Sequence, residues 1–148
     1  MIQQFLPKML ERKTGQIVAI SSIAGLIGTK NLVDYCASKY AVTGMMEALQ
    51  REFECSDREY IKVTTICPIG FASGMFKAVQ SRFQWLLPLL TLEYTADSCL
   101  DAILAEDALV TIPRNTYYIF HLGQKLMPSL GLKALRRFIE YEVSEHKR

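Results

Sequence analysis

The sequence predicts an α/β fold in which helices alternate with the buried strands of a parallel sheet. Three short runs, at residues 15–22, 61–67 and 108–112, are apolar and rich in β-branched side chains without strict alternation. Such runs are typical of parallel strands that are covered on both faces. The segments between them carry apolar residues at helical spacing, so we expect parallel pairing through right-handed crossovers.

The first half of the chain predicts two helices around the first strand. One helix is expected over residues 2–12, just before Gly15 opens the strand, and the other over residues 34–54, with Asp34 as its N-cap or first-turn acid. The apolar stripe of the first helix comprises Ile2, Phe5, Leu6, Met9 and Leu10. That of the second helix comprises Ala41, Val42, Met45, Leu49 and Phe53.

The second half predicts one further helix and the last strand. A long apolar stretch around Pro88 occupies residues 77–94. We expect Thr95 to cap a helix that continues to about Glu106. The strand that follows is stopped by Pro113, because proline has no amide hydrogen for the ladder.

One group of residues predicts proton-transfer chemistry. Ser22 ends the first strand, and Tyr35 and Lys39 follow it with the spacing Tyr-x-x-x-Lys at the start of a helix. Residues four apart share a helix face, so the ammonium and the phenol are expected side by side. A phenol ordinarily has a pKa of about 10, and a nearby ammonium favours its ionised form. By itself, however, such a pair arises more often by chance on a solvated helix face.

The residues around this group make chance an inadequate explanation. The apolar strand, Ser22, the small-residue turn Ala24-Gly25 and the segment Tyr-Cys-Ala-Ser-Lys at 35–39 together resemble the catalytic segment of the short-chain dehydrogenase/reductase family. This resemblance implies that Tyr35 is the acid/base, that Lys39 is its activator and a ribose contact, and that Ser22 is the substrate-orienting hydroxyl.

The resemblance also implies a Rossmann-type doubly wound parallel sheet. The three predicted strands would be the last three of the family's seven, so the chain would hold the C-terminal half of that sheet. The Gly-rich loop that binds the nucleotide, and the family's Asn-Asn-Ala-Gly segment, are not found in the sequence. One sheet edge and one apolar face are therefore expected to be uncovered.

A second block follows the second strand. Pro-Ile-Gly-Phe-Ala-Ser at 68–73 resembles the family's Pro-Gly-x-Val-x-Thr turn, which lines the nicotinamide. The match implies that Pro68, Phe71 and Ser73 join Tyr35 and Lys39 as contacts of an NAD or NADP cofactor. Where the family has Gly after Pro, this chain has an isoleucine, which the turn can accept if its φ stays negative. The alternative is an ordinary turn at the end of a strand.

Residues 5–9, 35–39 and 67–76 narrow the resemblance to the retinol dehydrogenase and 17-beta-hydroxysteroid dehydrogenase branch, and to epidermal retinol dehydrogenases in particular. This branch implies NAD(P)-dependent oxidation or reduction of a lipophilic alcohol or carbonyl, such as a retinoid or a steroid. The stretch at 83–92 resembles the family's substrate-binding lid. The expected substrate contacts are Ser22, Phe83, Trp85 and Leu86.

The branch implies a location on the cytoplasmic face of the endoplasmic reticulum or on lipid droplets. Its N-terminal anchor is not found, so a cytosolic location stays open as well. We divide the chain into residues 1–113, a partial catalytic half, and residues 114–148, a C-terminal amphipathic extension. The extension either packs on its own domain or lies on an anionic membrane surface.

Composition excludes several other classes of function. The formal net charge of +2 is too small to indicate a nucleic-acid partner. The four cysteines are scattered without a C-x-x-C pair, and the two histidines have no partners at metal spacing, so we expect reduced thiols and no metal. No apolar run approaches the roughly 18–20 residues that span a bilayer.

Three functions remain open on the sequence. The chain is an oxidoreductase, a catalytically silent truncated product such as a splice form or gene remnant, or a binding module. In the family, the helices that correspond to residues 2–12 and 34–54 form the dimer interface. They could therefore pair with a second copy or with a full-length relative.

Overall fold

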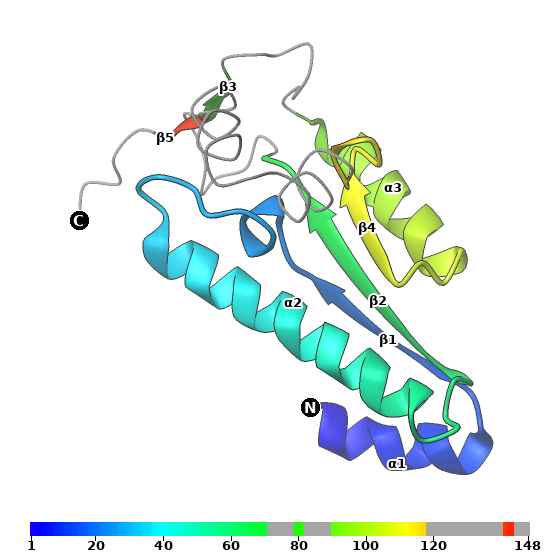
Figure 1. Cartoon of the computed structure of the whole chain (residues 1–148). Helices are drawn as coiled ribbons and strands as arrows, with labels where there is room; N and C mark the ends of the chain where they lie inside the picture. The colour runs from blue at the N-terminus through cyan, green and yellow to red at the C-terminus, as the bar shows by residue number, and fades with distance from the viewer. Residues whose placement is uncertain (71–78, 82–89, 118–140, 144–148) are drawn as a thin grey trace.

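A computed structural model describes residues 1–70, 79–81, 90–117 and 141–143. Its main sheet has three parallel strands in the order β1-β2-β4 (Figure 1). These strands are β1 (Gly15–Ile20), β2 (Ile61–Pro68) and β4 (Leu109–Ile112). The α/β fold and the parallel pairing predicted from the sequence are thus confirmed.

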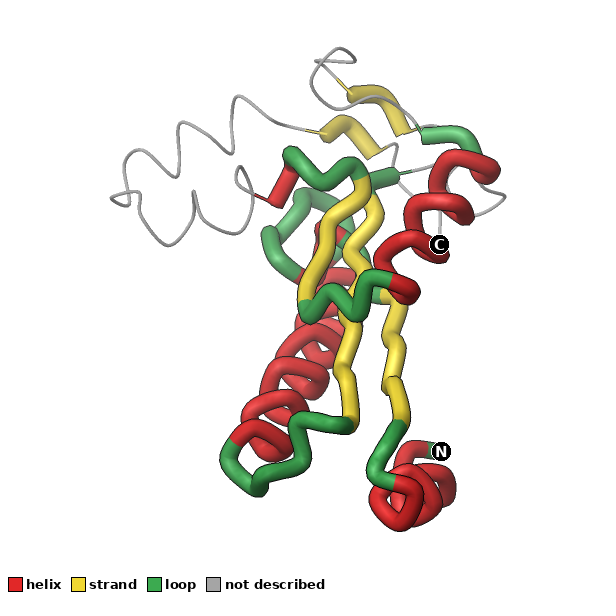
Figure 2. The backbone as a smooth tube through the Cα atoms, turned by 90° about the vertical axis from the view of Figure 1, so that its right-hand side faces the viewer, coloured by secondary structure: helices red, strands yellow, loops and turns green. Residues whose placement is uncertain are grey.

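Two helices lie on opposite faces of this sheet, as Figure 2 shows from the side. Helix α2 (Val33–Glu54) covers one face and helix α3 (Leu92–Leu104) covers the other. Helix α1 (Ile2–Arg12) packs against the start of β1 and shares its apolar cluster with α2. A short 3-10 turn, η1 (Ile23–Gly25), connects the end of β1 to the loop before α2.

Alternating strand residues divide the core into two clusters. On the α2 face, the fully buried members are Met46, Phe53, Ile61 and Val63. On the α3 face, they are Ile23, Ile27, Ile66, Ile69, Leu90, Ala102, Val110 and Ile112. Side chains of a strand alternate between faces, so residues an odd number apart lie on opposite faces. Val63 and Ile66 are three residues apart and therefore belong to different clusters.

Two details of the helices differ from the sequence prediction. Thr91, not Thr95, caps α3: its hydroxyl accepts the backbone N–H of Tyr94 at 3.2 Å, whereas Thr95 lies inside the helix with its hydroxyl bonded to the Thr91 carbonyl. In α2, Met46 faces the core at 1% exposure and Met45 is 50% exposed. Neighbouring positions differ by about 100° around a helix, so an apolar pair leaves the buried member undecided.

A two-stranded antiparallel sheet was not predicted. Strand β3 (Val79–Ser81) pairs with β5 (Tyr141–Val143), so a segment of the C-terminal extension lies beside a segment that follows β2. The amphipathic part of the extension, at residues 118–140, lies outside the described residues. The division of the chain at residue 113 stays a prediction.

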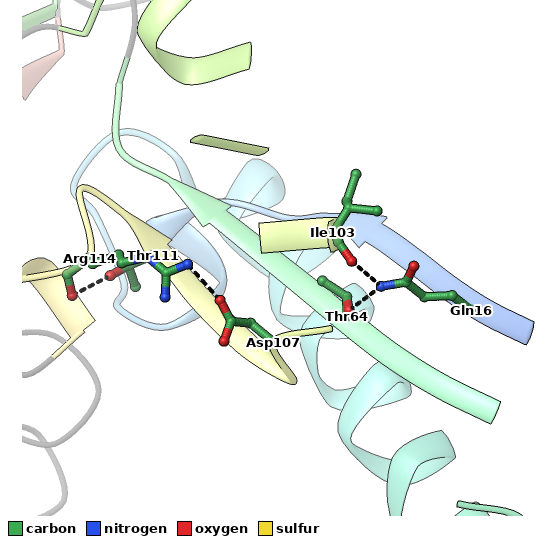
Figure 3. A network of polar contacts seen from close by, with 6 residues as sticks. All are labelled: Gln16, Thr64, Ile103, Asp107, Thr111 and Arg114. Atoms are coloured by element: carbon green, nitrogen blue, oxygen red, sulfur yellow. Dashed lines mark hydrogen bonds and ion pairs between the residues drawn. The ribbon is translucent and has the colours of Figure 1, made fainter. Parts of the chain in front are cut away.

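Polar contacts fasten the sheet to its surroundings (Figure 3). The Gln16 amide in β1 donates to the Thr64 hydroxyl of β2 at 3.0 Å and to the Ile103 carbonyl of α3 at 2.9 Å. Beside β4, Arg114 and Asp107 form an ion pair with 2.7 Å between Nη2 and Oδ2. The second contact joins the segment before β4 to the turn after it.

Strand β1 is one of the two edge strands of the described sheet. Val18 is 37% exposed and Ile20 is 58% exposed, both on the face that α3 covers only in part. This agrees with the expectation of an uncovered edge and apolar face. Among the described residues, none of the helices combines the length and the apolar character needed to cross a membrane.

Candidate active site

Ser22 lies where β1 ends at the carboxyl edge of the parallel sheet. Its backbone is extended, with φ −165° and ψ 164°, and its hydroxyl accepts the backbone N–H of Ala24 at 3.2 Å. The same hydroxyl donates to the carbonyl oxygen of Pro68, at the end of β2, at 3.5 Å. The carboxyl edge is where ligands bind to open α/β sheets, so Ser22 and Pro68 occupy the expected position for a site.

Tyr35 and Lys39 lie one turn apart at the start of α2. The Lys39 ammonium nitrogen is 5.7 Å from the centre of the Tyr35 ring and donates to the carbonyl oxygen of Ile20 at 3.3 Å. Asp34 accepts the backbone N–H of Tyr35 at 2.9 Å, and its negative charge is favourable at a helix N-terminus. Both predicted site residues on α2 are half-buried, so solvent and a ligand can reach them.

The end of β1 is bonded to α2 directly behind these residues. Ser21 is 4% exposed, and its hydroxyl donates to the carbonyl oxygen of Lys39 at 3.1 Å. Thr43 donates to the same carbonyl at 3.0 Å, and its oxygen is 2.9 Å from that of Ser21. Sequence reasoning missed both hydroxyls. Their positions in the sequence were the available signal. Ser21 is the residue before Ser22, and Thr43 lies four residues after Lys39, one turn further along the same helix.

Cys67 lies beneath the same group, at the end of β2. Burial raises the pKa of its thiol to about 11, against smaller opposing effects of hydrogen bonds from Ser21 and Thr43 and of the Lys39 charge. A thiol with such a pKa stays protonated near neutral pH. Cys67 therefore contributes packing and a weak hydrogen-bond donor rather than a nucleophile.

The other predicted contacts of the cofactor and the substrate stay predictions. Phe71, Ser73, Phe83, Trp85 and Leu86 all lie outside the described residues. Ile69, which departs from the family's glycine, has no positive φ, and its N–H donates to the Ile112 carbonyl at 2.9 Å. The turn after Pro68 thus accepts the larger side chain as expected.

The residues at this edge suit one end of a nicotinamide cofactor. A Lys39 ammonium has three donors, and the Ile20 carbonyl occupies one of them, which leaves capacity for ribose hydroxyls. Ser22, which follows β1, and Pro68, which ends β2, lie next to each other at this edge. In the described part of the chain, no cluster of acidic, histidine or cysteine side chains is arranged to hold a metal ion.

Comparison with known proteins places these residues in context. The family model described as short chain dehydrogenase matches residues 1–83. This range includes Ser22, Tyr35 and Lys39, and of the predicted site residues it leaves out Trp85 and Leu86. The bovine (Bos taurus) short-chain dehydrogenase/reductase family 16C member 6 is 40% identical over 95% of this chain. Mouse (Mus musculus) epidermal retinol dehydrogenase 2 is 39% identical over 89% of it.

Solved structures show the same fold. A gluconate 5-dehydrogenase from Burkholderia cenocepacia J2315, in complex with NADP and tartrate, matches 74% of this chain with a TM-score of 0.59 at 17% identity. The match covers 47% of that structure, and the two relatives are covered over 47% and 43% of their lengths. This chain thus spans about half the length of the proteins that it matches.

Proposed function

Because this chain belongs to the short-chain dehydrogenase family, we propose that it carries the catalytic residues of an NAD(P)-dependent oxidoreductase acting on a lipophilic alcohol or carbonyl. The observation that carries the proposal is the position of Lys39, whose ammonium lies 5.7 Å from the Tyr35 ring centre. The same ammonium donates to the carbonyl oxygen of Ile20, two residues before Ser22, at 3.3 Å. This is the carboxyl edge of the sheet, where open α/β sheets bind their ligands.

In this proposal each of the three side chains has a separate task. The Tyr35 hydroxyl moves a proton to or from the substrate oxygen, and the Lys39 ammonium stabilises the phenolate that forms. The Ser22 hydroxyl donates a hydrogen bond to the same substrate oxygen and so stabilises its developing charge. When bound, NAD or NADP supplies or accepts the hydride at the substrate carbon.

For the cofactor, we propose that Tyr35 and Lys39 contact the ribose and that Pro68, Phe71 and Ser73 line the nicotinamide. Supporting this assignment, the Pro68 carbonyl lies 3.5 Å from the Ser22 hydroxyl. For the substrate, the class is a retinoid or steroid, with Phe83, Trp85 and Leu86 as apolar contacts. Support for that class comes from the relatives, one of which is named epidermal retinol dehydrogenase 2.

We further propose that the three-stranded sheet is the C-terminal half of a Rossmann-type sheet. The unpaired outer side of β1 and the exposure of Ile20, 58%, support continuation of the sheet beyond β1 in the complete enzyme. Activity of this stretch alone would then require the nicotinamide end of the cofactor to bind without the family's nucleotide loop.

The first test is a titration of the purified, folded chain with NADH and with NADPH, followed by nicotinamide fluorescence. Saturable binding is expected, and Lys39→Ala should weaken it at least about tenfold, the loss of one charge-assisted contact. Lys8→Ala is the control, because Lys8 is an exposed residue of α1 away from the site. Absence of binding to both cofactors, or equal binding by Lys39→Ala, would exclude this function for the chain.

Catalysis is tested separately from binding. In Tyr35→Phe the ring is kept and the hydroxyl is lost, so cofactor binding should persist while oxidation of retinol or of a 17β-hydroxysteroid falls by about 100-fold or more. A short polar alcohol serves as the comparison substrate. Equal turnover by Tyr35→Phe and the parent would contradict the assignment of the proton-transfer group.

A second candidate function is that of a silent partner that pairs through α1 and α2. Exposed apolar side chains on these helices favour it, among them Phe5 at 58% and Met45 at 50%. Sedimentation should then detect a dimer, or a complex with a full-length relative, that the double variant Phe5→Glu, Met45→Glu abolishes. A monomer in both samples would exclude the pairing.

The location is proposed from the resemblance to the retinol dehydrogenase branch alone. We propose the cytoplasmic face of the endoplasmic reticulum or lipid droplets, with peripheral contact through the C-terminal extension. Cell fractionation of the tagged chain checks this, and recovery entirely in the cytosolic fraction would contradict it.

A further inference from the structure

We propose that Ser21 and Thr43 are positioning residues whose hydroxyls hold the Ser22 end of β1 against the Lys39 turn of α2. The significance of this contact for catalysis rests on the function proposed above. The contact itself is a property of the folded chain and can be measured without cofactor or substrate.

The contact joins two segments that are far apart in the sequence. Three oxygens form a triangle: Ser21 Oγ and Thr43 Oγ1 lie 2.9 Å apart, and both are close to the Lys39 carbonyl, at 3.1 Å and 3.0 Å. Thr43 donates to a carbonyl within its own helix, whereas Ser21 reaches that carbonyl from the end of β1. Ser21 therefore contacts the helix twice, at the Lys39 carbonyl and at the Thr43 hydroxyl, and Thr43 is the side chain of the helix that meets the strand end.

Two hydroxyl hydrogens are shared among the three oxygen–oxygen contacts. A Ser21 hydroxyl has one hydrogen, so it can be given either to Lys39 or to Thr43, while its lone pairs remain for acceptance. Thr43 supplies the second donor to the carbonyl. Because Ser21 is 4% exposed, loss of its partners would leave a buried polar atom unsatisfied.

Ser21 is also restrained from the strand side. Its backbone N–H donates to the Ile66 carbonyl of β2 at 2.7 Å, which continues the β1–β2 ladder by one residue. The two hydroxyls thus connect α2 to a residue whose backbone is already bonded to β2.

Gly25 shows how closely η1 approaches this triangle. A β-carbon at Gly25 would lie 2.6 Å from Ser21 Oγ, 2.7 Å from the Lys39 carbonyl and 2.7 Å from Thr43 Oγ1. A β-carbon does not approach non-bonded atoms this closely, so without a shift of the surrounding atoms only glycine fits here. The turn that begins with Ser22 is therefore packed directly on the three polar atoms.

This geometry gives the contact its functional meaning. Ser22 is bonded covalently to Ser21, and the Lys39 side chain belongs to the residue whose carbonyl receives the hydroxyls. A displacement of the strand end relative to α2 would change the separation of Ser22 from Tyr35 and Lys39. Errors of about 1 Å in such groups can lower turnover by roughly 100-fold.

The experiment compares two substitutions at one position. Thr43→Val keeps the shape of threonine and removes the hydroxyl, whereas Thr43→Ser keeps the hydroxyl and removes the methyl group. Amide hydrogen exchange is measured by NMR at Ala24 and Gly25, whose N–H groups bond to Ser22. We expect about fivefold faster exchange at both amides in Thr43→Val, in keeping with the loss of one net hydrogen bond, and parent-like exchange in Thr43→Ser.

Two controls separate local positioning from general stability. Ser56→Ala removes a hydroxyl that likewise bonds to the carbonyl four residues earlier, at 2.6 Å, but at the far end of α2. It should leave Ala24 and Gly25 unchanged. The amide of Ile69, bonded between β2 and β4, reports stability elsewhere and should exchange alike in all variants.

Three results would overturn the proposal. They are unchanged exchange in Thr43→Val, equal acceleration in Thr43→Val and Thr43→Ser, and a uniform acceleration that includes Ile69. If the exchange pattern is as expected but the parent binds neither NADH nor NADPH, the proposed function fails and the positioning of Ser22 stands. Where turnover is detected, Thr43→Val should lower kcat with KM unchanged, and Thr43→Ser should retain the parent kcat.

Discussion

The side-chain amide of Gln16 donates to the backbone carbonyl of Ile103 at 2.9 Å, so β1 is fastened to the end of α3 by residues 87 positions apart (Figure 3). The same nitrogen donates to Thr64 at 3.0 Å, and Thr64 has no exposed surface. One amide group therefore joins an edge strand, its neighbour and the helix on that face.

Gln16→Ala should lower the free energy of unfolding by about 1–3 kcal/mol, because it leaves the buried Thr64 hydroxyl without this donor. The measurement is urea denaturation followed by circular dichroism. Gln50→Ala is the control, since the Gln50 amide donates to Glu54 on the same helix, at 2.9 Å. It should change stability by no more than about 0.5 kcal/mol; equal losses in the two variants would contradict the bridging role of Gln16.

A pair of glycine substitutions tests the close packing of η1. Gly25→Ala would place a carbon 2.6 Å from Ser21 Oγ and should destabilise the chain by about 1–3 kcal/mol. Gly44 lies inside α2 with nothing within 4 Å of an added carbon, so Gly44→Ala should stabilise by about 0.5–1 kcal/mol. Thermal melting of the two variants should give shifts of opposite sign, and a stable Gly25→Ala would show that η1 can move away.

The two adjacent methionines of α2 test which side of the helix carries the core. Met46 is 1% exposed within the cluster on the α2 face, and Met46→Ala should cost about 2–5 kcal/mol. Met45→Ala, at 50% exposure, should stay within about 0.5 kcal/mol. Denaturant midpoints of the two variants measure the difference, and a reversed order would require a rotated helix.

Cys67 predicts how stability depends on alkaline pH. Its pKa in the folded chain is raised from 9.0 to about 11 by burial. Above pH 9 the unfolded chain loses this proton first, so stability is full below pH 9 and falls as pH rises through 11. The loss approaches about 3 kcal/mol, because each tenfold difference in proton affinity between the folded and the unfolded chain contributes roughly 1.4 kcal/mol.

Cys67→Ala should be less stable than the parent at pH 8 but should lose less stability between pH 8 and 11. Urea denaturation at a series of pH values measures both slopes, and the other titrating groups contribute equally to each. Parallel slopes for parent and variant would show that the thiol does not ionise differently on unfolding.

Much of the fold was predictable because its signals are local. Continuous β-branched runs predicted β1, β2 and β4, and helical spacing predicted α1 and α2 to within a residue or two. The first residue of α3 was not, since Thr91 and Thr95 are equally good caps in isolation. In the folded chain Thr95 is buried at 7% exposure and its hydroxyl donates to the Thr91 carbonyl, so the capping position belongs to Thr91.

By itself the sequence determined the family, the parallel α/β arrangement and the spacing of Ser22, Tyr35 and Lys39, because residue type and periodicity carry that information. Only the tertiary structure decided what lies behind those residues: the hydroxyls of Ser21 and Thr43 on one carbonyl, the glycine pressed against them and the buried thiol below. Such contacts join segments distant in the chain, and a local pattern cannot determine them. They arise when the sheet brings the end of β1 beside the first turns of α2.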